Sequence, residues 1–69
     1  MEISRKQMVV GVKYVVTKPS QHREFMVGDI IKLFDDGGIG NYKIGGIMRA
    51  EDVPSASKGM KCELLAVNL

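Results

Sequence analysis

The chain has 69 residues, of which 45% are hydrophobic, and ten basic residues against eight acidic ones give a net charge of +2. This length allows one domain, and a domain of this size buries only about 60% of the surface that its unfolded chain exposes. One cysteine and one histidine exclude an internal disulfide and a structural zinc site. The hydrophobic fraction argues against intrinsic disorder. We therefore expect one folded domain over residues 1–69, stabilised by its own core or by self-association.

No segment has the features of a secretory signal, because the longest apolar run near the start is residues 8–10. No stretch approaches the roughly 20 apolar residues that a membrane-spanning helix needs. The unpaired cysteine fits a reducing compartment. With Met1 in place, we expect a whole gene product located in the cytoplasm, with no membrane contact.

The first predicted strand runs from Met8 to Thr17, after polar residues 2–7 that form either an arm or the start of this strand. β-branched residues, which favour strands, dominate it. Its even positions form an unbroken apolar face and its odd positions a mixed one, so we expect the even face to meet the core. Pro19 lacks an N–H and ends the strand in a loop. The even face consists of Met8, Val10, Val12, Tyr14 and Val16.

A short strand over residues 23–26 is expected to lead into a tight turn at residues 27–29. The next strand, residues 30–34, is apolar except at Lys32, as expected of a central strand covered on much of both sides. Residues 35–38 then form a hairpin loop, because two consecutive glycines supply the positive φ that a short loop requires.

The hairpin's second strand is expected over residues 39–48, with Tyr42, Ile44 and Met48 on one face. Gly45-Gly46 interrupts it, which predicts a bulge or a sharp bend. Residues 49–59 are predicted as a loop with one helical turn, in which Pro54 takes a first helical position and Gly59 ends the turn.

The final strand is predicted over residues 60–69, with Met60, Cys62, Leu64 and Ala66 facing inward. From Leu65 onward the opposite face becomes apolar as well. Two interpretations stay open: either a bulge switches the inward face, or the end of the strand is covered on both sides, by a second chain for example.

The expected architecture resembles a Src-homology-type small barrel. It combines five short strands, a tight turn before the strand of residues 30–34, a glycine hairpin and a helical turn before the last strand. We therefore predict an all-β fold, a small five-stranded barrel with at most one short helical turn before the last strand. The expected core includes Val12, Ile31, Ile44 and Leu64.

The sequence offers no catalytic site, and we predict no enzyme activity, no cofactor and no metal. Nucleophilic catalysis needs a base within hydrogen-bond reach of an activated serine or cysteine, yet Cys62 falls on the predicted core face and His22 in a polar loop. Asp35 and Asp36 are adjacent and lack the spacing of a calcium loop. The lone G-x-G within residues 37–40 precedes a strand rather than a helix, which excludes a dinucleotide-binding loop.

A second apolar patch favours a protein partner. Contiguous exposed apolar area usually marks an interface, and free strand edges can recruit another strand. We expect a non-catalytic module that acts by protein–protein contact, as an adaptor or inhibitor of a larger machine; small chains of this kind recur among phage and mobile-element products. The same residues would serve a homo-oligomer, unless they belong to the interior. The candidate interface is Val9, Val15, Leu65, Val67 and Leu69.

Nucleic-acid binding is the alternative function. Through residue 23 there are five basic residues against one acidic, a net of +4, whereas the remainder has five against seven, a net of −2. Such an asymmetry can mark a basic face, although lysines also protect edge strands. Base stacking needs an exposed aromatic ring, for which Phe25 is the best candidate. The candidate contacts are Lys6, Lys13, Lys18, His22, Arg23 and Phe25.

Overall fold

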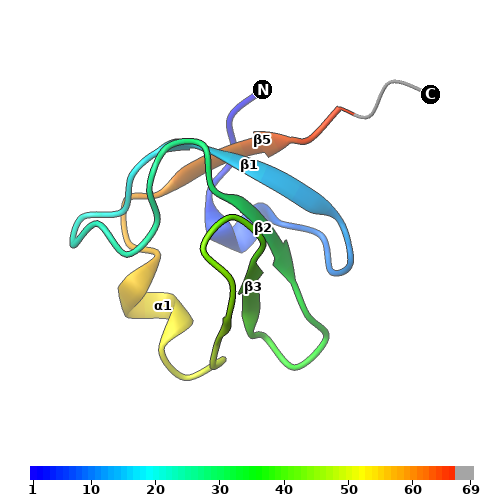
Figure 1. Ribbon diagram of the computed structural model, residues 1–69, viewed down its shortest axis with the longest axis vertical. Helices are drawn as coiled ribbons and strands as arrows, with labels where there is room; N and C mark the ends of the chain where they lie inside the picture. The colour runs from blue at the N-terminus through cyan, green and yellow to red at the C-terminus, as the bar shows by residue number, and fades with distance from the viewer. Residues whose placement is uncertain (67–69) are drawn as a thin grey trace.

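The computed structural model describes residues 1–66. Five antiparallel strands form one sheet in the order β4-β3-β2-β1-β5, so the prediction of a mostly β chain is confirmed. The sheet is strongly bent: β1 and β5 cross the top of the molecule while β2 and β3 run downward (Figure 1). β4 and β5 are its two edges, so pairing between these strands does not close the sheet. The elements are η1 Arg5–Gln7, β1 Lys13–Lys18, β2 Ile30–Leu33, β3 Ile39–Asn41, β4 Ile47–Met48, α1 Val53–Ala56 and β5 Lys61–Leu64.

The core lies on the inner face of the bent sheet and is completed by α1. Strand β1 alternates as expected of a half-buried strand, with Tyr14 and Val16 buried. The hydroxyl of Tyr14 is satisfied, because it accepts a hydrogen bond from the Val9 N–H at 3.0 Å. Ile31 of β2 is fully buried, as predicted. The buried apolar residues are Met8, Tyr14, Val16, Phe25, Ile31, Ile39, Val53, Ala56, Met60 and Cys62.

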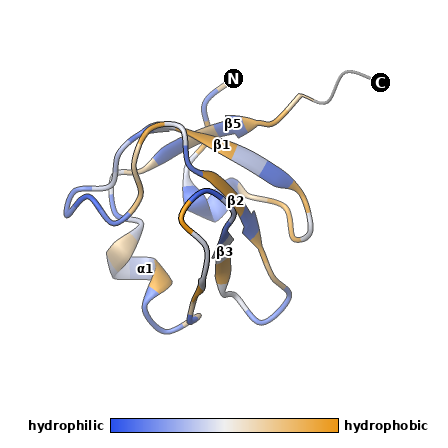
Figure 2. Ribbon diagram, viewed as in Figure 1, coloured by the Kyte–Doolittle hydropathy of each residue, from blue (hydrophilic) through white to orange (hydrophobic). Residues whose placement is uncertain are grey.

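The first strand begins at Lys13 rather than at Met8. The Val12 N–H donates to the Val9 carbonyl at 3.3 Å, and Gly11 has a φ of +83°, so residues 9–12 form a turn. The left-handed glycine conformation ends the extended chain although β-branched residues surround it. Val10 is consequently exposed, and Val12 packs against the core only in part. Figure 2 shows this apolar turn as a loop outside the sheet.

Two segments next to the sheet also differ from the predictions. The expected arm contains a 3₁₀ turn, η1, instead of extended chain. The expected strand over residues 23–26 is a turn, closed by Ser20 and Phe25: the Ser20 N–H donates to the Phe25 carbonyl at 3.0 Å, and the Phe25 N–H donates to Ser20 Oγ at 2.9 Å. This turn draws the Phe25 ring into the core, where it is 1% exposed.

The expected strand over residues 39–48 is two strands separated by a turn. Gly45 and Gly46 have φ values of +80° and +91°, which confirms the predicted bend. The turn places Tyr42 and Ile44 outside the core, with Ile44 72% exposed, so the assignment of Ile44 to the core is wrong. Met48 is partly buried against the core.

The end of the chain confirms the helical turn and shortens the last strand. α1 has Pro54 in its first turn, and Gly59 follows with a φ of +81°. Met60 and Cys62 are buried, but Leu64 is 64% exposed and Ala66 is exposed, so their assignment to the core is wrong. The irregularity in the β1–β5 pairing lies in β1, between Val16 and Lys18, rather than at Leu64 or Leu65.

Candidate functional site

The β4 edge of the sheet is open along the part of the chain that the structure describes. The Asn41 N–H donates to the Gly46 carbonyl at 3.1 Å. Hydrogen-bonded and non-bonded pairs alternate in an antiparallel ladder, so Ile47, which pairs with Gly40, occupies a non-bonded position. The N–H and C=O of Ile47 therefore point away from β3, where another strand could meet them.

The β5 edge is protected at Cys62. Ile3 forms an isolated bridge with Cys62: the Ile3 N–H donates to the Cys62 carbonyl at 2.8 Å, and the Cys62 N–H donates to the Ile3 carbonyl at 2.9 Å. Exposed edges are templates for further pairing, and proteins usually cover them. Because the bridge covers β5 at Cys62, the β4 edge is the more open of the two edges within residues 1–66.

An apolar hollow lies beside the open edge, and we call it the edge groove. Its volume is about 260 Å³. Phe25 and Ile39 line it from the core, while Ile44 and Ile47, 72% and 71% exposed, line it from outside. Its remaining lining residues are Glu24, Asn41, Gly45, Gly46 and Met48.

Asn41 shapes one wall of the edge groove. Its side-chain oxygen accepts hydrogen bonds from the N–H groups of Lys43 and Ile44 at 3.0 and 3.3 Å, which holds the turn that carries Ile44. Its amide nitrogen donates to the buried carboxylate of Asp29 at 2.9 Å. Neither residue was a candidate from the sequence. The available signal was an asparagine shortly before Gly45-Gly46, because asparagine side chains often bond the backbone N–H two residues on and so form a turn.

The outer face of the sheet carries a second cluster, the aromatic face. Lys13 and Lys32 are direct cross-strand partners, and their ammonium groups lie 4.8 and 5.7 Å from the centre of the Tyr42 ring. Lys32 pairs in turn with Gly40. A Cβ at Gly40 would lie 2.9 Å from the ring of Phe34 and 3.9 Å from that of Tyr42, so both rings lie over this glycine.

The predicted nucleic-acid contacts are distributed over separate elements. Lys13 joins the aromatic face, whereas Lys18 lies at the other end of β1 and Lys6 in η1. His22 and Arg23 are exposed in the turn over residues 20–25. The prediction for Phe25 is wrong, because its ring is in the core and cannot stack on a base.

The predicted protein-interface residues are only partly on one surface. Val15 of β1 pairs with Glu63 of β5, and the N–H of Leu65, directly after β5, donates to the Lys13 carbonyl at 3.1 Å, so Val15 and Leu65 lie on neighbouring segments, each partly buried. Val9 is exposed in the turn before β1. Val67 and Leu69 lie outside the described residues. The most exposed apolar side chains near a hollow are instead Ile44 and Ile47.

The single cysteine lies in strand β5, and the paired aspartates lie at the hairpin tip. Cys62 is fully buried, as predicted, and burial raises the pKa of its thiol to about 11. The carboxylates of Asp35 and Asp36 are exposed at the hairpin tip, where Asp36 accepts the Gly38 N–H at 2.8 Å. Within residues 1–66, no three histidine, cysteine or acidic side chains gather as a metal site would require. Over the same residues, no helix has the length and apolarity to cross a membrane.

Comparison with known proteins found no match for the chain, whether among models of protein families, curated proteins or solved structures.

Proposed function

We propose that this chain is a non-catalytic binding module that recognises a protein partner at the edge groove and the open β4 edge. The observation that carries the proposal is the pair Ile44 and Ile47, each more than 70% exposed beside an apolar hollow. Monomeric proteins seldom leave such side chains grouped in water unless another molecule covers them. An adaptor or inhibitor of a larger assembly has this property.

The partner segment best suited to this surface is an extended apolar strand. It would pair with the free N–H and C=O of Ile47 and place alternate side chains in the edge groove. Burying an isoleucine side chain contributes roughly 1.5–3 kcal/mol, so Ile44 and Ile47 together would offset much of the entropy lost on association.

Affinity capture from a cell extract treated with nuclease tests this proposal. The wild-type chain and an Ile47→Asp variant are compared, with Val10→Asp as the matched control, because Val10 is an exposed apolar residue in the turn before β1. Proteins held by the wild type and by Val10→Asp should be lost from Ile47→Asp. Equal capture by all three folded chains would refute the proposal, and circular dichroism confirms that each is folded.

For the finer fold we propose a half-open small barrel of the Src-homology type. The strand order, the helical turn directly before β5 and the strong bend of the sheet support it. Long-range contacts between residues at the two ends of the sheet, observed by nuclear Overhauser effects, would be expected of a barrel. Their absence from a complete data set would leave an open bent sheet.

Nucleic-acid binding stays a second candidate because the aromatic face combines two lysines with an exposed aromatic ring. Rings accept bases by stacking and ammonium groups hold phosphates. Fluorescence anisotropy with single-stranded DNA and RNA should then give affinities that fall with salt, with a slope of about 0.7 per phosphate contact. Lys32→Gln and Tyr42→Ala should weaken binding while Lys18→Gln, at the far end of β1, should not. Equal loss in all three variants would argue for diffuse electrostatic attraction.

A further inference from the structure

We propose that a basic hollow between η1 and the connection from α1 to β5 binds a compact phosphate-class anion, either inorganic phosphate or a phosphomonoester. Its volume is about 400 Å³. Four cationic side chains and no acidic residue contribute to its lining, and it is separate from both the edge groove and the aromatic face. The lining residues are Ser4, Arg5, Lys6, Pro54, Ser57, Lys58, Gly59, Met60 and Lys61.

Arg5 provides the feature that points to a ligand. Its Nε is buried without a hydrogen-bond partner among residues 1–66. Buried polar groups are nearly always paired, so the unpaired Nε marks an arginine whose donors the rest of the protein does not use, while the side chain as a whole is only partly buried. The guanidinium presents several N–H donors in a fixed plane, which matches the geometry of phosphate oxygens.

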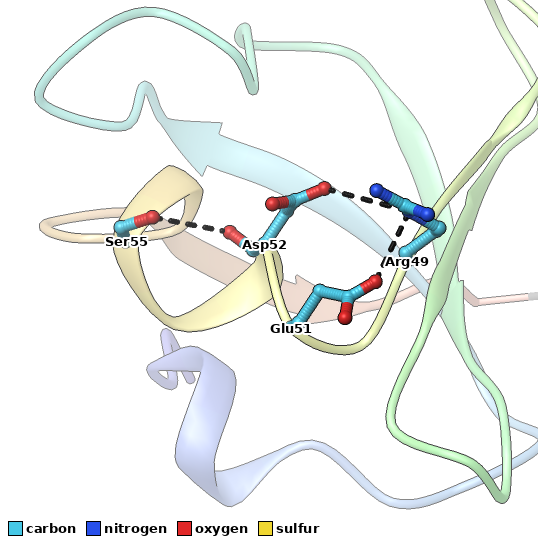
Figure 3. A network of polar contacts seen from close by, with 4 residues as sticks. All are labelled: Arg49, Glu51, Asp52 and Ser55. Atoms are coloured by element: carbon cyan, nitrogen blue, oxygen red, sulfur yellow. Dashed lines mark hydrogen bonds and ion pairs between the residues drawn. The ribbon is translucent and has the colours of Figure 1, made fainter.

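Arg49 shows how this chain satisfies an arginine when no ligand is needed. Its Nε lies 3.1 Å from a carboxylate oxygen of Glu51 and 4.0 Å from one of Asp52, in the loop before α1 (Figure 3). Within the described residues, none of the four cations around the basic hollow has a carboxylate within 4.0 Å. An anion with two negative charges would therefore meet several cationic side chains there without competition from a paired carboxylate.

The hydroxyl groups of the basic hollow are already engaged, so recognition depends on the cations. Ser57 Oγ donates to the Val53 carbonyl at 2.6 Å, and Ser4 Oγ contacts Gln7 Oε1 at 3.3 Å. A site built from charge and guanidinium geometry alone discriminates by anion charge and shape. It should favour a phosphate dianion over chloride.

The two walls of the basic hollow are held together by backbone hydrogen bonds. The Ile3–Cys62 bridge joins the chain before η1 to β5, and the Met60 N–H donates to the Ser57 carbonyl at 2.9 Å. On the far side of the connection, the Gln21 N–H donates to the Lys58 carbonyl at 2.7 Å. Arg5 and Lys58 are thus presented by anchored segments, which lowers the entropic cost of holding them around one ligand.

Thermal unfolding in inorganic phosphate, compared with sodium chloride at matched ionic strength and pH, tests the proposal. A ligand that binds only the folded state raises the unfolding temperature, and the rise grows with the logarithm of the ligand concentration above the dissociation constant. Phosphate should stabilise the wild type beyond chloride, and Arg5→Gln should weaken the dissociation constant roughly ten- to hundredfold. Lys43→Gln, a lysine outside the basic hollow, should behave as wild type.

A second set of unfolding measurements uses phosphoserine and a short single-stranded oligonucleotide as ligands. It distinguishes a site for a compact anion from a site for a polymer. Stabilisation by phosphate or phosphoserine that is lost in Arg5→Gln supports the proposal. Equal effects of phosphate and chloride, equal loss in Lys43→Gln, or a response to the oligonucleotide alone would overturn it. If Arg5→Gln does not fold, the double variant of Lys6→Gln and Lys58→Gln, both exposed positions, replaces it with the same expected result.

Discussion

The side-chain amide of Asn41 donates to the carboxylate of Asp29 across 2.9 Å, joining the end of β3 to the turn before β2. The same carboxylate oxygen also accepts the Met26 N–H at 3.0 Å. Asp29 is buried, and both of its bonds are part-buried. Since Asn41 also holds the turn of residues 42–46, this contact links the interior to the wall of the edge groove.

Asp29→Ala should therefore lower the free energy of unfolding by about 1–3 kcal/mol, because it leaves two part-buried donors without an acceptor. Urea denaturation measures this loss. Asn41→Ala removes the same bond, so the double variant should cost less than the sum of the two single variants. Strict additivity would mean that the contact contributes nothing to stability. Amide exchange at Lys43 and Ile44 should speed up in Asn41→Ala, since their acceptor is lost.

Ile31 and Ile47 provide a matched pair for separating the core from the groove. Ile31 is fully buried and Ile47 is 71% exposed. Ile31→Ala should cost roughly 2–5 kcal/mol, because it removes buried methyl groups and leaves a cavity. Ile47→Ala should stay within about 0.5 kcal/mol of wild type. Chemical denaturation of both variants checks the contrast, and a large loss for Ile47→Ala would place this residue in the folding core instead.

The sequence pattern correctly predicted the elements whose backbone conformation is determined by residues close by in the chain. Alternation in residues 13–18, the glycine hairpin, and Pro54 followed by Gly59 each specify their structure through neighbours in the chain. Ile31 and Cys62 were correctly assigned to the core for the same reason.

The wrong predictions concern segments whose structure depends on the conformation of a single glycine or on contacts between residues far apart in the chain. Gly11 takes a positive φ and ends a run of valines that otherwise predicts a strand. Asp29 contacts Asn41 from twelve residues away, and the side chain of Asn41 also accepts the N–H of Ile44 in the turn that carries it. Periodicity carries no information about such long-range contacts, so the edge groove and the basic hollow could be located only in the folded chain.

Gly40 makes possible the close packing of Phe34 and Tyr42 on the aromatic face. Its φ is not in the positive region, so alanine is allowed by the backbone. A Cβ there would nevertheless lie 2.9 Å from the Phe34 ring, which must rotate off the sheet. Gly40→Ala should therefore cost about 1–3 kcal/mol.

The control for this steric effect is the same substitution in a Phe34→Ala background. There the cost of Gly40→Ala should fall close to zero, because the obstructing ring is gone. Gly45→Ala serves as a second comparison: its Cβ would meet open space, but its φ of +80° makes alanine unfavourable whether or not Phe34 is present. If the cost of Gly40→Ala is unchanged without the Phe34 ring, the ring does not lie over Gly40.

Cys62 should make the fold sensitive to alkaline pH. Burial raises the pKa of its thiol from 9.0 to about 11. Below about pH 9 the thiol is protonated in both the folded and unfolded chains, so it adds no pH dependence there. Between about pH 9 and 11 the unfolded chain loses the proton while the folded chain keeps it. Unfolding is then favoured by up to about 1.4 kcal/mol for each pH unit.

The measurement is urea denaturation at several pH values from 8 to 11, with Cys62→Val as the control that retains an apolar side chain and removes the thiol. Every other titratable group is common to the wild type and the variant, so the difference between the two stability profiles isolates Cys62. The wild type should lose stability more steeply than Cys62→Val above pH 9, and the two profiles should run parallel below it. Parallel profiles across the whole range would mean that the thiolate is tolerated at its place in β5, and that water reaches Cys62 in the folded chain.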